Sequence, residues 1–79
     1  MAERSAAHAG FGRAIRDFRR QRGVSQEQLG FDSDLHRTYI GGIERGERNP
    51  SFQNIVRIAE ALGVAPSELM AAAERNWSG

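Results

Sequence analysis

The sequence predicts an all-α fold of five helices, four of them short. Apolar residues recur at spacings of three and four, as on one face of a helix, and no segment alternates apolar and polar residues as a half-buried strand does. Serines that can start helices and glycines that can end them stand at the ends of these periodic segments. The 79 residues leave room for one core, and the absence of cysteine excludes a disulfide framework.

The first helix is expected to begin at Phe11. Phe11, Ile15 and Phe18 fall on one face of a helix, and Gly23 stands where that helix would end. Residues 1–10 are small and polar, and they are interpreted as a flexible N-terminal arm, either without regular structure or partly helical.

Two further short helices follow, joined by a tight turn. Ser25 and Gln28 form a capping box, in which the serine accepts a bond from the first turn and the glutamine reaches back. This helix ends near Asp32 or Ser33, and Asp34 tolerates the left-handed backbone that such a turn needs. The third helix runs over residues 37–45.

The last two helices complete the domain. Ser51 starts the fourth helix and Gly63 ends it, while Pro66 suits the first turn of a fifth. The inward stripe of the fourth helix consists of Ile55, Ile58, Ala59 and Leu62. The domain is expected to span residues 11–73, followed by a C-terminal tail over 74–79.

The second and third helices have the features of a helix-turn-helix, in which one helix braces another that projects into the DNA major groove. The projecting helix needs one apolar and one polar face, and small residues must stand where the two helices cross. Gly30 and Ser33 are those small residues. The residues expected to be buried are Leu29, Leu35, Ile40 and Ile43.

The segments SQEQL at 25–29, YI at 39–40, IERG at 43–46 and ALGV at 61–64 carry a family resemblance. They resemble the Cro and phage-repressor type of helix-turn-helix, also called the xenobiotic-response-element family, over residues 11–70. The resemblance implies a five-helix, lambda-repressor-like domain, with the helix-turn-helix at helices two and three, that binds double-stranded DNA. Residues 35–40 and 43–51 are also similar to the controller proteins of restriction–modification systems, although other compact regulators share such runs.

The resemblance places base reading in the first turn of the third helix, at Arg37 and Thr38. A guanidinium can fork onto a guanine edge, a contact worth about 1–3 kcal/mol of discrimination. Gly41 and Gly42 carry no side chain, so base reading should be concentrated in that first turn. The two glycines either let the backbone approach the groove or stand where nothing packs.

The polar residues around this turn are expected to contact the DNA backbone. They are Ser25, Gln26, His36, Tyr39, Arg45, Arg48 and Asn49. The free amides at the start of the second helix suit a phosphate, and His36 stands at the N-cap of the third. Tyr39 is expected either to donate to a phosphate or to pack its ring beside the core. By the same resemblance, Arg19 and Glu44 are a structural pair that ties the first helix to the third.

A homodimer is expected because one such unit reads too few base pairs to be specific. Two units related by a two-fold axis would read half-sites roughly 34 Å apart. The apolar residues left over after a four-helix core are Val64, Leu69, Met70 and Trp77. They are the expected dimer interface.

The sequence indicates no catalytic or ligand-binding centre. It shows no nucleophile–base set, and two distant histidines without cysteine make no metal site, so no enzyme activity, metal or cofactor is predicted. No effector pocket, signal peptide or membrane span is indicated, which favours the cytoplasm. The predicted function is a sequence-specific, double-stranded DNA-binding transcription regulator, such as a repressor, acting as a homodimer on a palindromic operator. The alternative is a protein-interaction or antitoxin-type module with the same fold.

Overall fold

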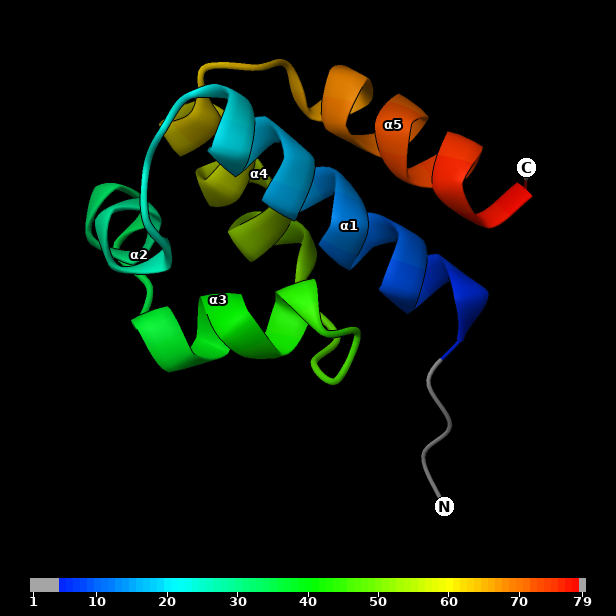
Figure 1. Ribbon diagram of the computed structural model, residues 1–79, viewed down its shortest axis with the longest axis horizontal. Coiled ribbons are helices and arrows are strands. Elements are labelled where there is room, and N and C mark those ends of the chain that lie inside the picture. The colour runs from blue at the N-terminus through cyan, green and yellow to red at the C-terminus, as the bar shows by residue number, and fades with distance from the viewer. Residues whose placement is uncertain (1–4, 79) are drawn as a thin grey trace.

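The computed structural model describes residues 5–78, which form five helices joined by short turns (Figure 1). The helices are α1 (Ala6–Gln21), α2 (Gln26–Ser33), α3 (Arg37–Glu44), α4 (Phe52–Leu62) and α5 (Pro66–Ser78). These residues contain no strand, so the all-α prediction is confirmed. In Figure 1, α1 runs through the middle of the molecule and antiparallel to α5, while α3 lies along the lower edge.

Serine hydroxyls start α1, α2 and α4, since each accepts a hydrogen bond from a backbone N–H of the first turn. The capping box predicted for α2 is only half present. Ser25 accepts from the N–H of Gln28 at 2.9 Å, but the Gln28 side chain donates forward to Asp32 at 2.8 Å instead of reaching back. Asp34 ends α2 with φ at 59°, as expected for that turn.

Both ends of the chain are more helical than the sequence pattern indicates. α1 begins at Ala6, so residues 6–10 of the expected arm belong to the domain, and residues 1–4 lie outside the described residues. α5 continues to Ser78 through most of the expected tail. The two ends support each other, because Asn76 donates through Nδ2 to the carbonyl oxygen of Gly10 at 2.9 Å. Residues 6–10 are mostly alanine and glycine, which form no pattern of large apolar residues, so the sequence did not indicate the first turn of α1.

One hydrophobic core lies between the helices. Its largest fully buried side chains are Ile15, Leu29, Ile40, Ile43, Ile58 and Leu69. Val64 and Leu69 both belong to this core, so the expectation that they form a dimer interface is wrong. The reason is that α5 is part of the core itself and closes it from the side of α1 and α4.

Glycines allow the closest approaches between the helices. A methyl group at Gly12 of α1 would overlap the carbonyl oxygens of Ile43 and Glu44 at the end of α3. At Gly30 a methyl group would lie 2.6 Å from the carbonyl oxygen of Leu35, which confirms that a small residue is needed at the helix crossing. The position of α3 therefore depends on backbone contacts with α1 and with the turn.

Substitution Gly12→Ala is expected to lower the free energy of unfolding by about 1–3 kcal/mol, because α3 must move to admit the methyl group. Gly41→Ala is the matched control. Its nearest neighbours are the ends of the Arg45 and Gln26 side chains, and replacing a helical glycine gains about 1 kcal/mol. Urea unfolding measures both variants, and a Gly12→Ala protein as stable as Gly41→Ala would contradict the close contact.

Candidate nucleic-acid interface

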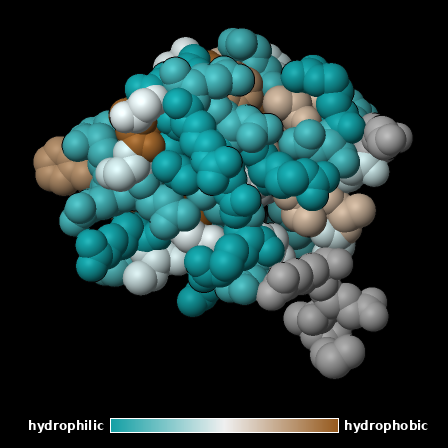
Figure 2. Space-filling view, viewed as in Figure 1, coloured by the Kyte–Doolittle hydropathy of each residue, from teal (hydrophilic) through white to brown (hydrophobic). Residues whose placement is uncertain are grey.

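α3 is exposed at its first turn and buried over residues 40–44, and polar side chains gather at that first turn. Ile40 and Ile43 are buried, whereas Arg37 and Thr38 are exposed. The surface along α3 is mainly hydrophilic in Figure 2. The first turn of α3 is thus accessible to a large polar ligand.

The last residue of α3, Glu44, is a buried carboxylate held by side chains from α1 and α2. Arg19 donates through Nε to Oε2 at 2.7 Å and through Nη2 to Oε1 at 3.1 Å, and Gln26 donates through Nε2 to Oε1 at 3.0 Å. Arg16 Nε lies 3.6 Å from Oε1. Arg19 also donates to the carbonyl oxygen of Val24 at 3.0 Å, so one guanidinium joins α1, the following loop and α3.

These neighbours keep Glu44 ionised. Burial raises the pKa of its carboxyl, but the hydrogen bonds from Arg19 and Gln26 and the charges of Arg19 and Arg16 outweigh burial, so the pKa of Glu44 lies below its ordinary value. The bond to Glu44 likewise raises the pKa of Arg19. The two residues expected to tie the first helix to the third are therefore in direct contact.

His36 caps α3 with its ring, at the position predicted for it. Its Nδ1 accepts from the N–H of Thr38 at 3.1 Å and lies 2.8 Å from Oγ1 of the same threonine. The cap therefore holds the Thr38 hydroxyl close to the start of the helix. A contact of either side chain with DNA stays a prediction.

The two glycines of α3 are covered by side chains, which corrects the idea that nothing packs there. A methyl group at Gly41 would lie 3.1 Å from Nη1 of Arg45 and 3.5 Å from Oε1 of Gln26. A methyl group at Gly42 would lie 2.6 Å from Cγ of Arg48. The missing side chains thus leave room for arginines from the end of the helix and the loop after it to lie against α3.

Three other residues expected at the DNA backbone are distributed along α3 and the chain that follows it. Tyr39 is half-buried against the core, and its hydroxyl accepts from Nδ2 of Asn54 at 3.2 Å, which leaves the hydroxyl hydrogen available to donate. Arg45 donates through Nε to Glu47 at 3.0 Å. Asn49 is exposed on the loop after α3. The packing of the Tyr39 ring beside the core is therefore observed, and donation from its hydroxyl to a phosphate stays a prediction.

Sequence reasoning missed two acidic residues that contact these arginines. Glu27 Oε2 lies 3.2 Å from Nη1 of Arg37, and Glu47 pairs with Arg45. The first pair could have been expected, since a helix-turn-helix brings the first turns of its two helices together. Glu27 and Arg37 are ten residues apart and lie on different helices, so the helical periodicity of the sequence does not indicate this pair.

Apolar side chains also reach the surface at a hollow that adjoins the loop after α3. Met70 and Trp77 of α5 line a shallow hollow of about 150 Å³, together with Pro50 and Ile55 among others. Phe52, which begins α4, is 80% exposed but does not line this hollow. We refer to Met70 and Trp77 as the apolar face. Of the four residues expected at a dimer interface, only Met70 and Trp77 lie there.

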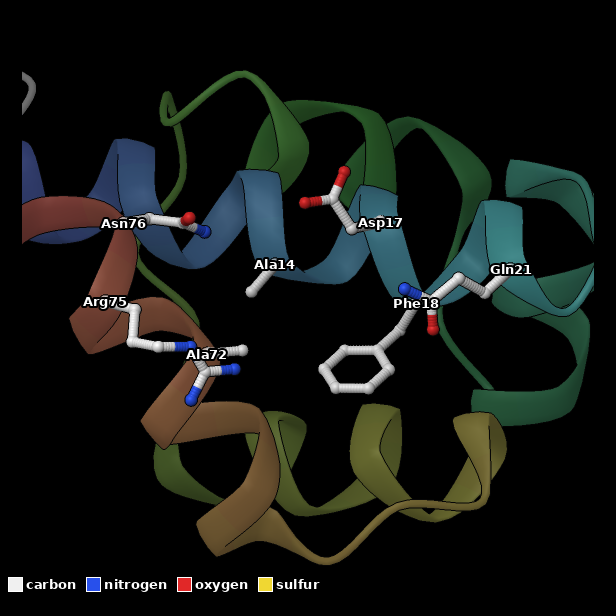
Figure 3. A pocket seen from close by; sticks show the side chains of 7 residues that line it. All are labelled: Ala14, Asp17, Phe18, Gln21, Ala72, Arg75 and Asn76. Carbon is white, nitrogen blue, oxygen red and sulfur yellow. The ribbon is translucent and has the colours of Figure 1, made fainter. Parts of the chain in front are cut away.

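A second hollow, of about 220 Å³, lies between α1 and α5 (Figure 3). Asp17 and Phe18 line it from α1, and Arg75 and Asn76 line it from α5. None of its lining residues belongs to α2 or α3, so it is separate from the candidate interface.

Within residues 5–78, no helix is both long and apolar enough to cross a membrane. No group of three or more histidine, aspartate or glutamate side chains in these residues is placed to hold a metal ion.

Comparison with known proteins defines the class. Residues 15–69, well over half of the chain, match the family model described as helix-turn-helix. The chain therefore belongs to the helix-turn-helix family, and the fold expected from its sequence motifs is confirmed.

Within that family, the chain is similar to control proteins of restriction–modification systems. It is 52% identical over 61 residues to control protein C.BamHI of Bacillus amyloliquefaciens, which covers 76% of this chain and 75% of that protein. The crystal structure of the controller protein C.AhdI from Aeromonas hydrophila matches with 48% identity and a TM-score of 0.81, over 82% of this chain and 98% of that one. The controller protein C.Esp1396I, solved as a tetramer with its natural 35-base-pair operator, matches with 29% identity and a TM-score of 0.86, over 95% and 99%.

Substitution Glu44→Gln is expected to lower the free energy of unfolding by about 1.5–3 kcal/mol at pH 7, because it weakens hydrogen bonds made to a charged group. The pKa of Glu44 is lower in the folded protein, so its contribution is complete above the unfolded value of about 4.3 and is lost as the pH falls through the folded value. Urea unfolding between pH 3 and 7 should therefore show a steeper acid loss for the wild-type protein than for Glu44→Gln.

The exposed carboxylate of Glu60 on α4 provides the control for this prediction. Glu60→Gln should change the stability by less than about 0.5 kcal/mol and keep the wild-type pH dependence. Identical behaviour of Glu44→Gln and Glu60→Gln would show that the buried pair does not stabilise the fold.

Proposed function

We propose that this protein is a sequence-specific, double-stranded DNA-binding transcription regulator of the restriction–modification controller type. The observation that carries the proposal is the placement of α3. Its last residue, Glu44, is anchored in the protein, while its first turn exposes Arg37 and Thr38. A helix held in this way can enter a major groove and read base edges. The operator complex of the similar C.Esp1396I supports the proposal.

Base reading falls to Arg37 and Thr38, and the surrounding polar residues hold the DNA backbone. These are Ser25, Gln26, His36, Tyr39, Arg45, Arg48 and Asn49. The side chain of Gln26 already donates to Glu44, so its contribution comes chiefly from the free backbone N–H at the start of α2. Such backbone contacts fix the register of a protein on DNA, and base contacts select the sequence.

The regulator acts as a homodimer on a palindromic operator. Val64 and Leu69 are buried in the monomer, so the proposed contact is the apolar face, formed by Met70 and Trp77. Met70 is exposed and Trp77 is half-buried, and the apolar surface that they leave accessible is stabilised when a second copy covers it. A two-fold axis there would set the spacing between the two copies of α3, and with it the spacing of the half-sites.

The proposed activity is reversible binding in the cytoplasm, with no catalytic step. The relatives are transcription regulators and control proteins, which supports a binding role. The site offers arginine, threonine and backbone N–H groups, which suit recognition of a polyanion.

Selection of bound duplexes from a random pool tests the proposal. We expect enrichment of a palindrome, and the logarithm of the affinity should fall with the logarithm of salt concentration by about 0.9 for each phosphate neutralised. Failure to enrich any duplex, together with salt-insensitive binding of a protein partner, would contradict the proposal and favour a protein-interaction module.

Substitution Arg37→Ala should weaken binding to the selected duplex by about 1–3 kcal/mol and relax the preference at one base pair of each half-site. Arg48→Ala is the matched control, since it should weaken selected and random duplexes alike. Fluorescence anisotropy with both duplexes measures the two effects. An equal loss on selected and random DNA in Arg37→Ala would rule out base reading by this residue.

Substitution Met70→Glu should convert the dimer to a monomer, because it would place a charge on the apolar face of each copy. Phe31→Glu is the control, since Phe31 is 82% exposed on α2, outside that face. Sedimentation equilibrium at high micromolar concentration without DNA should show a dimer for the wild-type protein and for Phe31→Glu. A monomeric wild-type protein, or a dimeric Met70→Glu, would exclude the apolar face as the interface.

A further inference from the structure

Two of the three arginines at the candidate interface are paired with a carboxylate in the free protein. Arg37 contacts Glu27 across the gap between α3 and α2, and Arg45 contacts Glu47. With Arg48, these five residues carry a single net positive charge. A surface that holds DNA by charge alone would not place two carboxylates on its own arginines, since each one weakens attraction to phosphate.

The Glu27–Arg37 contact adds little to the stability of the fold. The two side chains are 75% and 62% exposed, and exposed pairs of this kind contribute about 0–1 kcal/mol. The two helices are already joined by buried apolar residues and by the bonds to Glu44. The contact does place the Arg37 guanidinium beside the first turn of α2.

The geometry of the contact leaves Arg37 able to read a base. Arg37 donates to Glu27 Oε2 through Nη1, so the edge of the guanidinium formed by Nε and Nη2 is not used by this bond. That edge carries two parallel N–H donors, the pattern that matches O6 and N7 of guanine. The carboxylate also stands in the first turn of α2, next to the amides expected to hold a phosphate, and repels a phosphate that approaches Arg37.

We propose that Glu27 is a specificity-determining positioning residue: it holds Arg37 ready for a guanine and keeps it from binding phosphates of any sequence. The inference rests on the proposed DNA-binding function and assigns a role to a residue that does not itself read bases. On a correct site, guanine supplies two bonds that offset the nearby negative charge. On other sequences no such bonds form, and the carboxylate lowers the affinity.

The test compares Glu27→Gln with Asp32→Asn, which removes the same charge from the same helix but is bonded to Gln28 rather than to an interface arginine. The probes are the duplex selected by the wild-type protein and a random duplex of equal length. Glu27→Gln should bind the random duplex about threefold to tenfold more tightly, with a steeper salt dependence, and should gain less on the selected duplex. Asp32→Asn should leave the ratio of the two affinities unchanged.

The same comparison in an Arg37→Ala background shows whether Glu27 acts through Arg37. There, Glu27→Gln should no longer change the affinity ratio. An unchanged ratio in Glu27→Gln itself, or a change that persists without Arg37, would overturn the inference while sequence-specific binding by the wild-type protein still stands. If the wild-type protein enriches no duplex, the proposed function fails first, and this inference fails with it.

Discussion

The placement of α3 depends on the hydrogen bonds that the buried carboxylate of Glu44 accepts. Its bonds to Arg19 and Gln26 join three helices at one point, and Arg19 extends the connection to the loop before α2. α3 has eight residues and two glycines, too short and too weak in helix propensity to be stable alone. Its position therefore comes from tertiary contacts. The hydrogen bonds to Glu44 are the polar, buried and directional ones among them.

The two ends of α3 have different roles: the C-terminal end is fixed to the protein, and the N-terminal end is exposed. At the C-terminal end, the close approach at Gly12 and the Glu44 cluster fix the helix to α1 and α2. At the N-terminal end, the His36 cap leaves Arg37 and Thr38 exposed. Anchoring one end lets the other be polar and accessible without loss of the fold, which is what a helix that enters a groove requires.

The fold could be predicted from the sequence because its signals are local. Serine caps, Asp34 in the turn and Gly30 at the helix crossing each act within a few residues. The candidate site was only partly predictable, because its remaining features depend on packing. Burial of Leu69 removes it from any interface, and the position of Arg48 against Gly42 depends on how the loop after α3 folds back.

The most direct test of the account is the mapping of amide chemical-shift changes on adding the selected duplex to the labelled protein. The account predicts that the changes centre on the start of α2, the first turn of α3 and the loop around Arg48 and Asn49, with little change along the exposed side of α5. Changes that centre on α5 or on the hollow between α1 and α5, while the first turn of α3 stays unaffected, would contradict it.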